Sequence, residues 1–219
     1  GFHGTSHRFV AAKVPELVGR PAGELKTIVC HLGNGSSISA VKYGKCVDTS
    51  MGLTPLEGVI MGTRCGSIDP AIVPFLMEKK GLSAAEMDTY MNKKSGVLGL
   101  SGISSDFRDL NDAADAGNER AKLALEAFAY SVKKYIGAYA AAMNGVDVIA
   151  FTAGVGENDH VVRRLVMEDM EYLGVDFDFE RNDNLELSKP GSKVKVWIVP
   201  TNEELVIATD TYELTKEIR

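Results

Sequence analysis

The sequence predicts an α/β fold, with a mixed sheet flanked by helices, from three observations. Residues 27–48 contain three short strands separated by tight turns, which is typical of an antiparallel meander. Residues 118–144 carry apolar side chains at three- and four-residue steps, which predicts one long amphipathic helix. Residues 146–152 form a mostly apolar strand that runs into a glycine-rich turn and a further helix. A last strand over residues 194–199, followed by a helix, completes the alternation.

Composition argues against several classes of protein. The chain has 219 residues, 45% of them apolar and 25% charged, which is ordinary for one large globular domain or two small ones. Its net charge of −6 argues against nonspecific binding to nucleic acid or to an anionic membrane. No apolar run is long enough to span a bilayer, and no signal-peptide pattern is seen. Three cysteines without metal-type spacing argue against a disulfide framework, so we expect a cytoplasmic protein.

The first residues carry a glycine-flanked histidine, His3. The chain begins inside the run Gly1-Phe-His-Gly-Thr-Ser-His7, without methionine, so we expect a fragment of a longer protein. His3 would lie just outside the first helix, where it could donate a hydrogen bond to an anion or serve as a surface or capping histidine. His7 and His160 are interpreted as surface or cap residues.

Capping residues predict the starts of the shorter helices. These side chains accept hydrogen bonds from free backbone N–H groups. The expected caps are Thr5 or Ser6, Asp69, Ser83 with Glu86 in a capping box, and Ser105 or Asp106. Pro15 and Gly19 are expected to end the first helix, and residues 96–102 are expected to be a loop.

The turn between the first two strands is unusually small and polar. Gly33, Asn34, Gly35, Ser36 and Ser37 leave backbone N–H groups open. Asn34-Gly35 is the strongest short hairpin signal, because both residues tolerate positive φ. Such a turn can hold an anion through its N–H groups, with the amide and hydroxyl groups as further donors. A plain hairpin is the commoner fate of such residues.

Arg64 stands on a loop between small residues. Gly62 and Gly66 free the backbone on either side of it. A guanidinium on such a loop suits planar, bidentate contact with a phosphate or a carboxylate. A surface ion pair is the alternative use of the same side chain.

The long helix at residues 118–144 presents an apolar face and many further alanines. The apolar face consists of Ala121, Leu125, Phe128, Val132, Ile136, Tyr139 and Met143. The alanines permit close packing of a second element. Burial in the core is the default interpretation of these residues, and a dimer contact is the alternative.

Two features follow in the last third of the chain. Gly154 and Gly156 stand where a strand gives way to a helix, which would direct free N–H groups and the positive end of a helix dipole at a ligand. Glu203 and Glu204 open the last helix. Acidic residues suit a first helical turn, but one of them could instead hold Mg²⁺, directly or through water.

The order of these elements matches the ribonuclease H-like domain of the actin, Hsp70 and sugar kinase superfamily. Six more specific motifs follow one another along the chain: Phe2-His-Gly-Thr-Ser-His7, His31-Leu-Gly-Asn-Gly-Ser-Ser37, Asp48-Thr-Ser-Met-Gly-Leu-Thr-Pro-Leu-Glu-Gly58, Met61-Gly-Thr-Arg64, Phe151-Thr-Ala-Gly-Val-Gly-Glu-Asn158 and Thr201-Asn-Glu-Glu204. With these motifs, from Gly1 nearly to Arg219, the chain resembles the acetate kinase family. The resemblance covers the family's C-terminal domain only. Residues 1–219 are therefore expected to be that nucleotide-binding and dimerisation domain, with the N-terminal domain absent.

The resemblance implies transfer of the ATP γ-phosphoryl group to acetate, with Mg²⁺ or Mn²⁺, giving acetyl phosphate and ADP. His3 and Arg64 resemble the residues that stabilise the transferred phosphoryl group. Glu203 resembles the magnesium-linked acid, and Phe2 and Pro55 resemble part of the pocket for the acetate methyl group. The expected nucleotide contacts are His31, Leu32, Gly33, Asn34, Gly35, Asp106, Phe107, Arg108, Ala153, Gly154, Val155, Gly156 and Glu157.

The chemistry of phosphoryl transfer agrees with these roles. The transition state carries negative charge on its equatorial oxygens, so it needs fixed positive donors rather than a protein nucleophile. A carboxylate acceptor is already a nucleophile near neutral pH, so no strong general base is required. After the arginine the family often has Ser-Gly-Asp, whereas this chain has Cys65-Gly66-Ser67, which could alter a local contact.

The resemblance leaves the acyl group open. A propionate or butyrate kinase would share these motifs, because Phe2 and Pro55 alone do not define the size of a pocket. A noncatalytic nucleotide-binding module of the same superfamily is the alternative from another class, but it has no need of His3 and Arg64. Family members are homodimers joined through this domain. Because the motifs of the other domain are absent, we expect this chain alone not to turn over.

Overall fold

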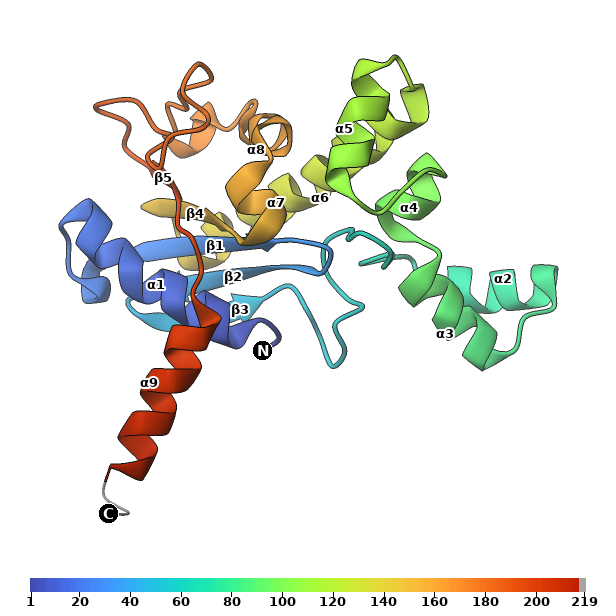
Figure 1. The fold of residues 1–219 in the computed structure, drawn as a ribbon, viewed down its shortest axis with the longest axis horizontal. Helices are drawn as coiled ribbons and strands as arrows, with labels where there is room; N and C mark the ends of the chain where they lie inside the picture. The colour runs from blue at the N-terminus through green and yellow to red at the C-terminus, as the bar shows by residue number, and fades with distance from the viewer. Residues whose placement is uncertain (217–219) are drawn as a thin grey trace.

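The computed structural model describes residues 1–216, in which the strands form one mixed sheet of order β3-β2-β1-β4-β5 (Figure 1). The strands β1 (Lys26–Leu32), β2 (Ser36–Lys42) and β3 (Lys45–Thr49) pair antiparallel as a meander. The strands β4 (Val148–Thr152) and β5 (Lys195–Ile198) join as parallel neighbours, β4 on β1 and β5 on β4. The expected α/β fold with a mixed sheet is confirmed.

Helices cover both faces of this sheet (Figure 1). On one face, α1 (Gly4–Val18) packs against β1 and β4. On the other face lie α6 (Glu119–Met143), α7 (Ala153–Asn158) and α8 (His160–Met167). The last helix, α9 (Glu203–Thr215), starts beside α1 and projects from the body. The remaining elements are α2 (Ile72–Lys80), α3 (Ala84–Lys93), α4 (Gly96–Ser101), α5 (Phe107–Asp115) and the short 3₁₀ turns Ala22–Glu24 and Glu171–Leu173.

The two faces of the sheet bury separate apolar clusters, because side chains alternate along a strand. Ile28, Cys30 and Leu32 enter the larger cluster on the α6 side, whereas Val29 enters the smaller cluster beneath α1. All seven residues of the predicted apolar face of α6 are buried. The core interpretation of that face is therefore confirmed.

The two turns of the meander differ from the expectation. The residues between Leu32 and Ser36 form a three-residue loop in which neither Asn34 nor Gly35 has positive φ. The paired positive φ values of a two-residue hairpin occur instead at Tyr43 (56°) and Gly44 (79°). The prediction that Asn34-Gly35 would use its tolerance of positive φ is therefore wrong.

The first helix begins earlier than predicted. His3 is its N-cap residue, in the left-handed conformation (φ 55°), so neither Thr5 nor Ser6 caps it. Pro15 lies inside the helix, and only Gly19 ends it. Pro15 has no N–H, so the bond to the carbonyl of Ala11 is missing, and the helix continues past it to Val18.

Two segments predicted as loop or turn are helical. Residues 96–101 form α4 because the carbonyls of Met61 and Gly62, which lie far earlier in the chain, accept from the N–H groups of Val97 and Leu98. Residues 153–158 form α7, and a break at Asp159 starts α8. Arg163 explains α7, since its buried guanidinium donates to the carbonyls of Gly156 (3.1 Å) and Glu157 (3.0 Å) at the end of that helix.

Two other predicted caps are confirmed. Ser83 and Glu86 form a capping box at α3, and Asp106 accepts from the backbone N–H of Arg108 at the start of α5. These two starts could be predicted because each cap depends on residues within one helical turn. The predicted cap at Asp69 is wrong, because Ala71 is the N-cap residue of α2 and the Asp69 carboxylate accepts from the Ala71 N–H in the turn before the helix.

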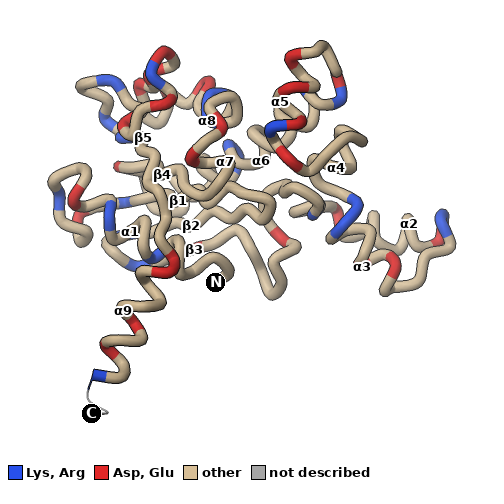
Figure 2. Tube along the Cα trace, in the orientation of Figure 1, with Lys and Arg blue, Asp and Glu red and all other residues tan. Residues whose placement is uncertain are grey.

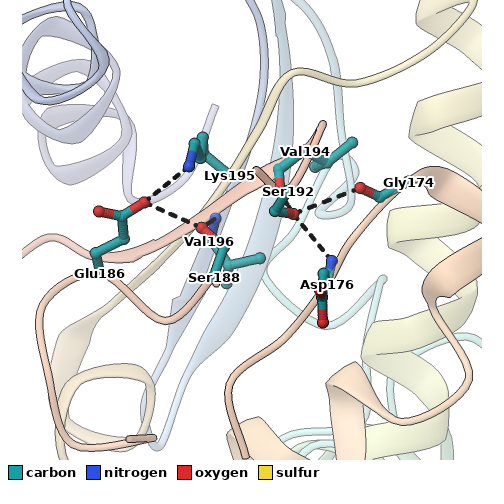
Figure 3. Close-up of polar contacts among 8 residues, drawn as sticks. All are labelled: Gly174, Asp176, Glu186, Ser188, Ser192, Val194, Lys195 and Val196. Atoms are coloured by element: carbon teal, nitrogen blue, oxygen red, sulfur yellow. Dashed lines mark hydrogen bonds and ion pairs between the residues drawn. The ribbon is translucent and has the colours of Figure 1, made fainter. Parts of the chain in front are cut away.

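The segment between α8 and β5 is irregular, as expected, but well bonded. Ser192 Oγ accepts from the backbone N–H of Asp176 (2.9 Å) and donates to the carbonyl of Val194 (2.6 Å) (Figure 3). Lys195 Nζ donates to Glu186 Oε1 at 3.1 Å in the same region (Figure 3). These bonds hold the segment against the β5 edge of the sheet.

Charged residues of both signs are distributed over the described part of the chain. Figure 2 shows acidic and basic residues interspersed along the helices and loops. Among residues 1–216, no helix combines the length and apolarity needed to cross a bilayer. Cys30, Cys46 and Cys65 are free thiols, as expected.

Candidate functional site

A cleft of about 740 Å³ opens where β1 and β4 end. Ligands of α/β folds commonly bind beyond the carboxyl ends of parallel strands, and this volume suits a small molecule. Its walls come from the β1–β2 turn, the start of α5 and the α7–α8 segment. The cleft brings together seven of the predicted nucleotide residues, namely Gly33, Asn34, Asp106, Phe107, Arg108, Gly154 and Val155.

Sequence reasoning missed several other residues of this cleft. They are Ser105, Asn111, Asp112, Asn158, Asp159 and His160. Asn111 Nδ2 donates to Asp159 Oδ2 at 2.8 Å, which joins α5 to the start of α8. The place of Asn111 and Asp112 in the cleft could have been predicted from helical spacing. They follow Arg108 by three and four residues and so lie on the same face of α5.

The other predicted nucleotide residues lie outside the lining of this cleft. The Leu32 side chain is fully buried in the core. Gly156 is buried against β1, where a Cβ would lie 3.5 Å from the carbonyl oxygen of Cys30. Glu157 Oε1 accepts from the backbone N–H groups of Ala153 (2.8 Å) and Thr201 (3.2 Å), so it ties the turn after β4 to the start of α9.

Beside the cleft, His3 and Arg64 converge on Gly35. A Cβ on Gly35 would lie 3.2 Å from Arg64 Nη1 and 3.5 Å from both Cε1 and Nε2 of His3. Glycine at this position therefore leaves room for both side chains to approach the turn. The structure brings the two predicted catalytic residues together, although they belong to different segments.

The loop that carries Arg64 is firmly held. Its carbonyls at Met61 and Gly62 accept from the first free N–H groups of α4, at 2.9 and 3.0 Å. The N–H of Gly62 donates to the carbonyl of Asn34 (3.0 Å), which joins the loop to the β1–β2 turn. Arg64 Nη1 also donates to the carbonyl of Pro55 at 3.2 Å. The guanidinium is thus fixed before any ligand arrives.

The electrostatics keep the His3 ring neutral at pH 7. Burial lowers the pKa of the imidazole, the carboxylate of Glu203 raises it in part, and the charge of Arg64 lowers it further. Glu203 is therefore close enough to influence the same site. In the described part of the chain no group of three or more acidic, histidine or cysteine side chains gathers as a metal cage.

His7 is buried, so its interpretation as a surface or cap residue is wrong. Its ring bonds to Ser37 and Ser39 of β2 at 2.7 and 2.8 Å. His31 is also buried and stacks on His3, with ring centroids 4.0 Å apart and planes inclined by 19°. His160 is exposed at the start of α8, as expected. His7 and His31 therefore gather around His3, whereas His160 lies apart from them.

The two buried histidines are expected to make stability depend on pH. Burial is the main cause that lowers the pKa of His7 to about 4 and that of His31 to about 3, from an ordinary 6.5. The unfolded chain therefore binds protons at higher pH than the folded chain. This part of the stability is complete above pH 6.5 and is lost as the pH falls toward 4, by up to about 1.4 kcal/mol per pH unit for each ring.

Urea unfolding at pH 7.5 and pH 5.0 measures this loss. A His7→Gln variant, which cannot titrate, should lose less free energy of unfolding between the two pH values than the parent protein. His160→Gln is the control and should match the parent, because His160 is exposed. If the free energy of unfolding depended equally on pH in the parent and in His7→Gln, the lowered pKa of His7 would be contradicted.

The structure does not place the two predicted acyl-pocket residues in one cavity. Phe2, 41% exposed, lines a cavity of about 450 Å³ between α1 and the meander. Pro55 is not part of that cavity and lies against Arg64 through its carbonyl. Their shared role stays a prediction.

A family model described as the acetokinase family matches residues 1–209. This chain belongs to the acetokinase family. Its acetokinase relatives include acetate kinase of Methanosarcina barkeri, 59% identical over 220 residues that cover 99% of this chain and 54% of the relative. Acetate kinase of Carboxydothermus hydrogenoformans is 62% identical over 218 residues, with 98% and 54% coverage.

Two solved structures share the fold of this chain closely. Acetate kinase of Porphyromonas gingivalis aligns with a TM-score of 0.94 at 53% identity, covering 97% of this chain and 55% of that one. A propionate kinase of Francisella tularensis aligns with a TM-score of 0.90 at 39% identity, covering 96% and 54%. The chain spans about half the length of the acetokinase relatives that it matches.

Proposed function

We propose that this chain is the C-terminal, nucleotide-binding domain of a longer enzyme that transfers the γ-phosphoryl group of ATP to acetate. The observation that carries the proposal is the convergence of His3 and Arg64 on Gly35, beside a cleft large enough for a nucleoside. The identity to named acetate kinases, 59% for the Methanosarcina barkeri protein, supports the same reaction. The N-terminal half of the enzyme would supply the rest of the site.

The cleft would hold the adenosine, and the β1–β2 turn would hold the phosphates. Asp106 accepts hydrogen bonds from the Arg108 guanidinium at the cleft wall and so orients it. The Arg108 side chain is 89% exposed, so the flat face of the guanidinium would be free to stack on a base. Asn111 lines the cleft, and its buried Oδ1 has no hydrogen-bond partner among the described residues. Gly33 and Asn34 line the side of the cleft that faces Gly35.

The residues around Gly35 would stabilise the transfer itself. An acetate oxygen attacks the γ-phosphorus, a new P–O bond forms, and the bond to the bridging oxygen breaks to release ADP. Arg64 supplies a permanent charge to the equatorial oxygens, and neutral His3 supplies an N–H donor. Because the donors are already in place, little reorganisation is needed as charge develops.

A magnesium ion bound with ATP would neutralise phosphate charge, and Glu203 is the residue that would hold it. A single carboxylate fits this use, since Mg²⁺ in kinase sites takes most of its ligands from phosphates and water. Glu203 lies at the start of α9 and raises the pKa of His3, which supports a position on the phosphoryl side of the site.

The acyl group is the first point to test. Hydroxamate formation by the full-length protein is measured with ATP and acetate, propionate or butyrate. We expect the highest kcat/KM with acetate and no turnover by residues 1–219 alone, because half of the site is missing. A higher kcat/KM with propionate would favour the alternative that the Francisella tularensis structure suggests by its name. Failure with all three acids would refute the proposed reaction.

We also propose a cytoplasmic homodimer joined through the outer face of α6. Leu123 (53% exposed) and Tyr130 (64%) lie on that face, and Ala138 shares a hollow of about 390 Å³ with Tyr130. Apolar side chains of this size at a surface suit a protein partner. Light scattering that gives a monomer at micromolar concentration would contradict the dimer.

A further inference from the structure

Three buried side chains line up behind His3 and form a continuous hydrogen-bonded chain. Ser39 Oγ lies 2.8 Å from His7 Nδ1, and His7 Nε2 lies 2.7 Å from Ser37 Oγ. Ser37 Oγ in turn lies 2.8 Å from His3 Nδ1. Ser37 and Ser39 are at most 1% exposed and His7 is 7% exposed. We call Ser39, His7, Ser37 and His3 the histidine–serine chain.

Counting protons limits this chain to three arrangements. A hydroxyl donates one hydrogen bond and can accept two, and a neutral imidazole carries one N–H. His7 is neutral at pH 7, because burial lowers its pKa to about 4. In one further arrangement both rings donate to Ser37, but the Ser37 hydroxyl then has no acceptor among the described residues, because its hydrogen-bond partners there are the two rings. Otherwise, either every donor points from His3 toward Ser39, or every donor points from Ser39 toward His3. In the first arrangement a neutral His3 has its proton on Nδ1, and in the second the proton is on Nε2.

The surroundings favour the second arrangement. In the first, the Ser39 hydroxyl would need another acceptor, yet among the described residues His7 is its single hydrogen-bond partner. A buried hydroxyl left without an acceptor costs free energy. In the second, Ser39 donates to His7 Nδ1, His7 Nε2 donates to Ser37, and Ser37 donates to His3 Nδ1.

The second arrangement also gives His3 the proton that phosphoryl transfer requires. Nε2 is the nitrogen that faces Gly35 beside Arg64, since a Cβ on Gly35 would lie 3.5 Å from it. Phosphoryl oxygens accept hydrogen bonds, so only a protonated Nε2 can stabilise them. His31 stacks on the same ring at 4.0 Å and is itself fixed by Ser6 Oγ at 2.8 Å, which fixes the plane of the ring.

We propose that Ser39, His7 and Ser37 are positioning residues, which fix neutral His3 as the Nε2–H tautomer aimed at the transferred phosphoryl group. This inference rests on the proposed function for its kinetic consequence, but not for the tautomer itself. None of the three touches substrate, and each acts through His3.

A double-mutant cycle in the full-length protein tests the kinetic consequence. Ser37→Ala should lower kcat roughly ten- to a hundredfold, as is typical when a partner that orients a functional histidine is lost, with KM for ATP nearly unchanged. Ser37→Thr retains the hydroxyl and should recover most of the activity. In the His3→Ala background, Ser37→Ala should cause no further loss, because Ser37 acts only through His3. Additive losses would overturn the proposal.

Ser192→Ala is the matched control. Ser192 is also a buried serine, but its hydroxyl bonds to backbone groups in another part of the fold and to no histidine (Figure 3). Its loss should lower stability without lowering kcat. This separates an effect on His3 from a general effect of removing a buried hydroxyl.

The tautomer is read directly from ¹⁵N-labelled imidazole resonances of the full-length protein, with the His3 signal assigned by its loss in His3→Ala. We expect the proton of neutral His3 on Nε2. A proton on Nδ1 would overturn the proposal, whatever the kinetics. This measurement needs no turnover. It therefore tests the His3 tautomer even if the assays with acetate, propionate and butyrate refute the proposed reaction.

Discussion

Replacing Arg64 by alanine in the full-length protein is expected to lower kcat for acyl phosphate formation by a factor of about 10²–10³. Arg64 is held beside Gly35 by its own loop, so it is preorganised for the charge that develops on the phosphoryl oxygens. Because that charge is larger in the transition state than in bound ATP, KM for ATP should change much less than kcat.

A conservative variant and a control variant show whether the loss of kcat is specific to the Arg64 guanidinium. Arg64→Lys keeps a positive charge but loses the planar fork, so it should recover only part of the activity. Arg181→Ala is the control, since the Arg181 side chain is 74% exposed in the irregular segment before β5 and should leave kcat unchanged. A kcat of Arg64→Ala within threefold of the parent value would remove Arg64 from the catalytic machinery.

Gly96→Ala should be strongly destabilising and should also lower activity. Gly96 has a φ of 63°, and a Cβ there would lie 2.3 Å from the carbonyl oxygen of Met61 and 2.9 Å from those of Gly62 and Arg64. These are backbone atoms that cannot swing away. The left-handed conformation costs alanine about 1–2 kcal/mol and the overlap about 1–3 kcal/mol more. The displaced loop is the one that carries Arg64.

Gly81→Ala separates the two causes. Gly81 has nearly the same φ, 65°, but a Cβ there would meet nothing within 4 Å. It should therefore lose only the conformational contribution, about 1–2 kcal/mol, and leave kcat unchanged. Urea unfolding and steady-state kinetics measure both effects. Equal losses in Gly81→Ala and Gly96→Ala would show that the contact with the Arg64 loop has no energetic importance.

Much of the fold was predictable because its signals are local. The apolar period of α6 and the capping box of Ser83 with Glu86 each depend on residues within a few positions. The three strands of the meander follow from alternating apolar segments and small turns. Tight turns were less predictable in detail, since Tyr43 rather than Asn34 adopts positive φ.

The failures share a different cause, which is dependence on distant residues. Residues 96–101 resemble a loop in composition, but the 61–64 loop satisfies the first N–H groups of the helix. Residues 153–158 contain two glycines, but Arg163 satisfies the carbonyls at the end of α7. Neither partner can be identified from the composition of the segment itself, because glycine lowers helix propensity unless tertiary contacts compensate.

The residues of the site also divide into those predictable from local motifs and those that depend on distant contacts. The turns that carry Gly33 and Gly154 are visible as motifs, whereas Asn111 joins the cleft only through the packing of α5. The burial of His7 could have been predicted from the spacing of residues in the sequence. His3 and His7 share one helix face, and Ser37 and Ser39 share one strand face, so the two pairs can meet across the α1–sheet interface.

A crystal structure of the full-length protein with ADP, Mg²⁺, acetate and aluminium fluoride tests the central claim most directly. Aluminium fluoride stands in for the phosphoryl group in transfer. We expect adenosine in the cleft lined by Asp106 and Gly154, with fluoride ligands about 3 Å from both His3 Nε2 and Arg64 Nη1. Fluoride ligands bound out of reach of these two atoms, with the nucleotide in place, would contradict the central claim.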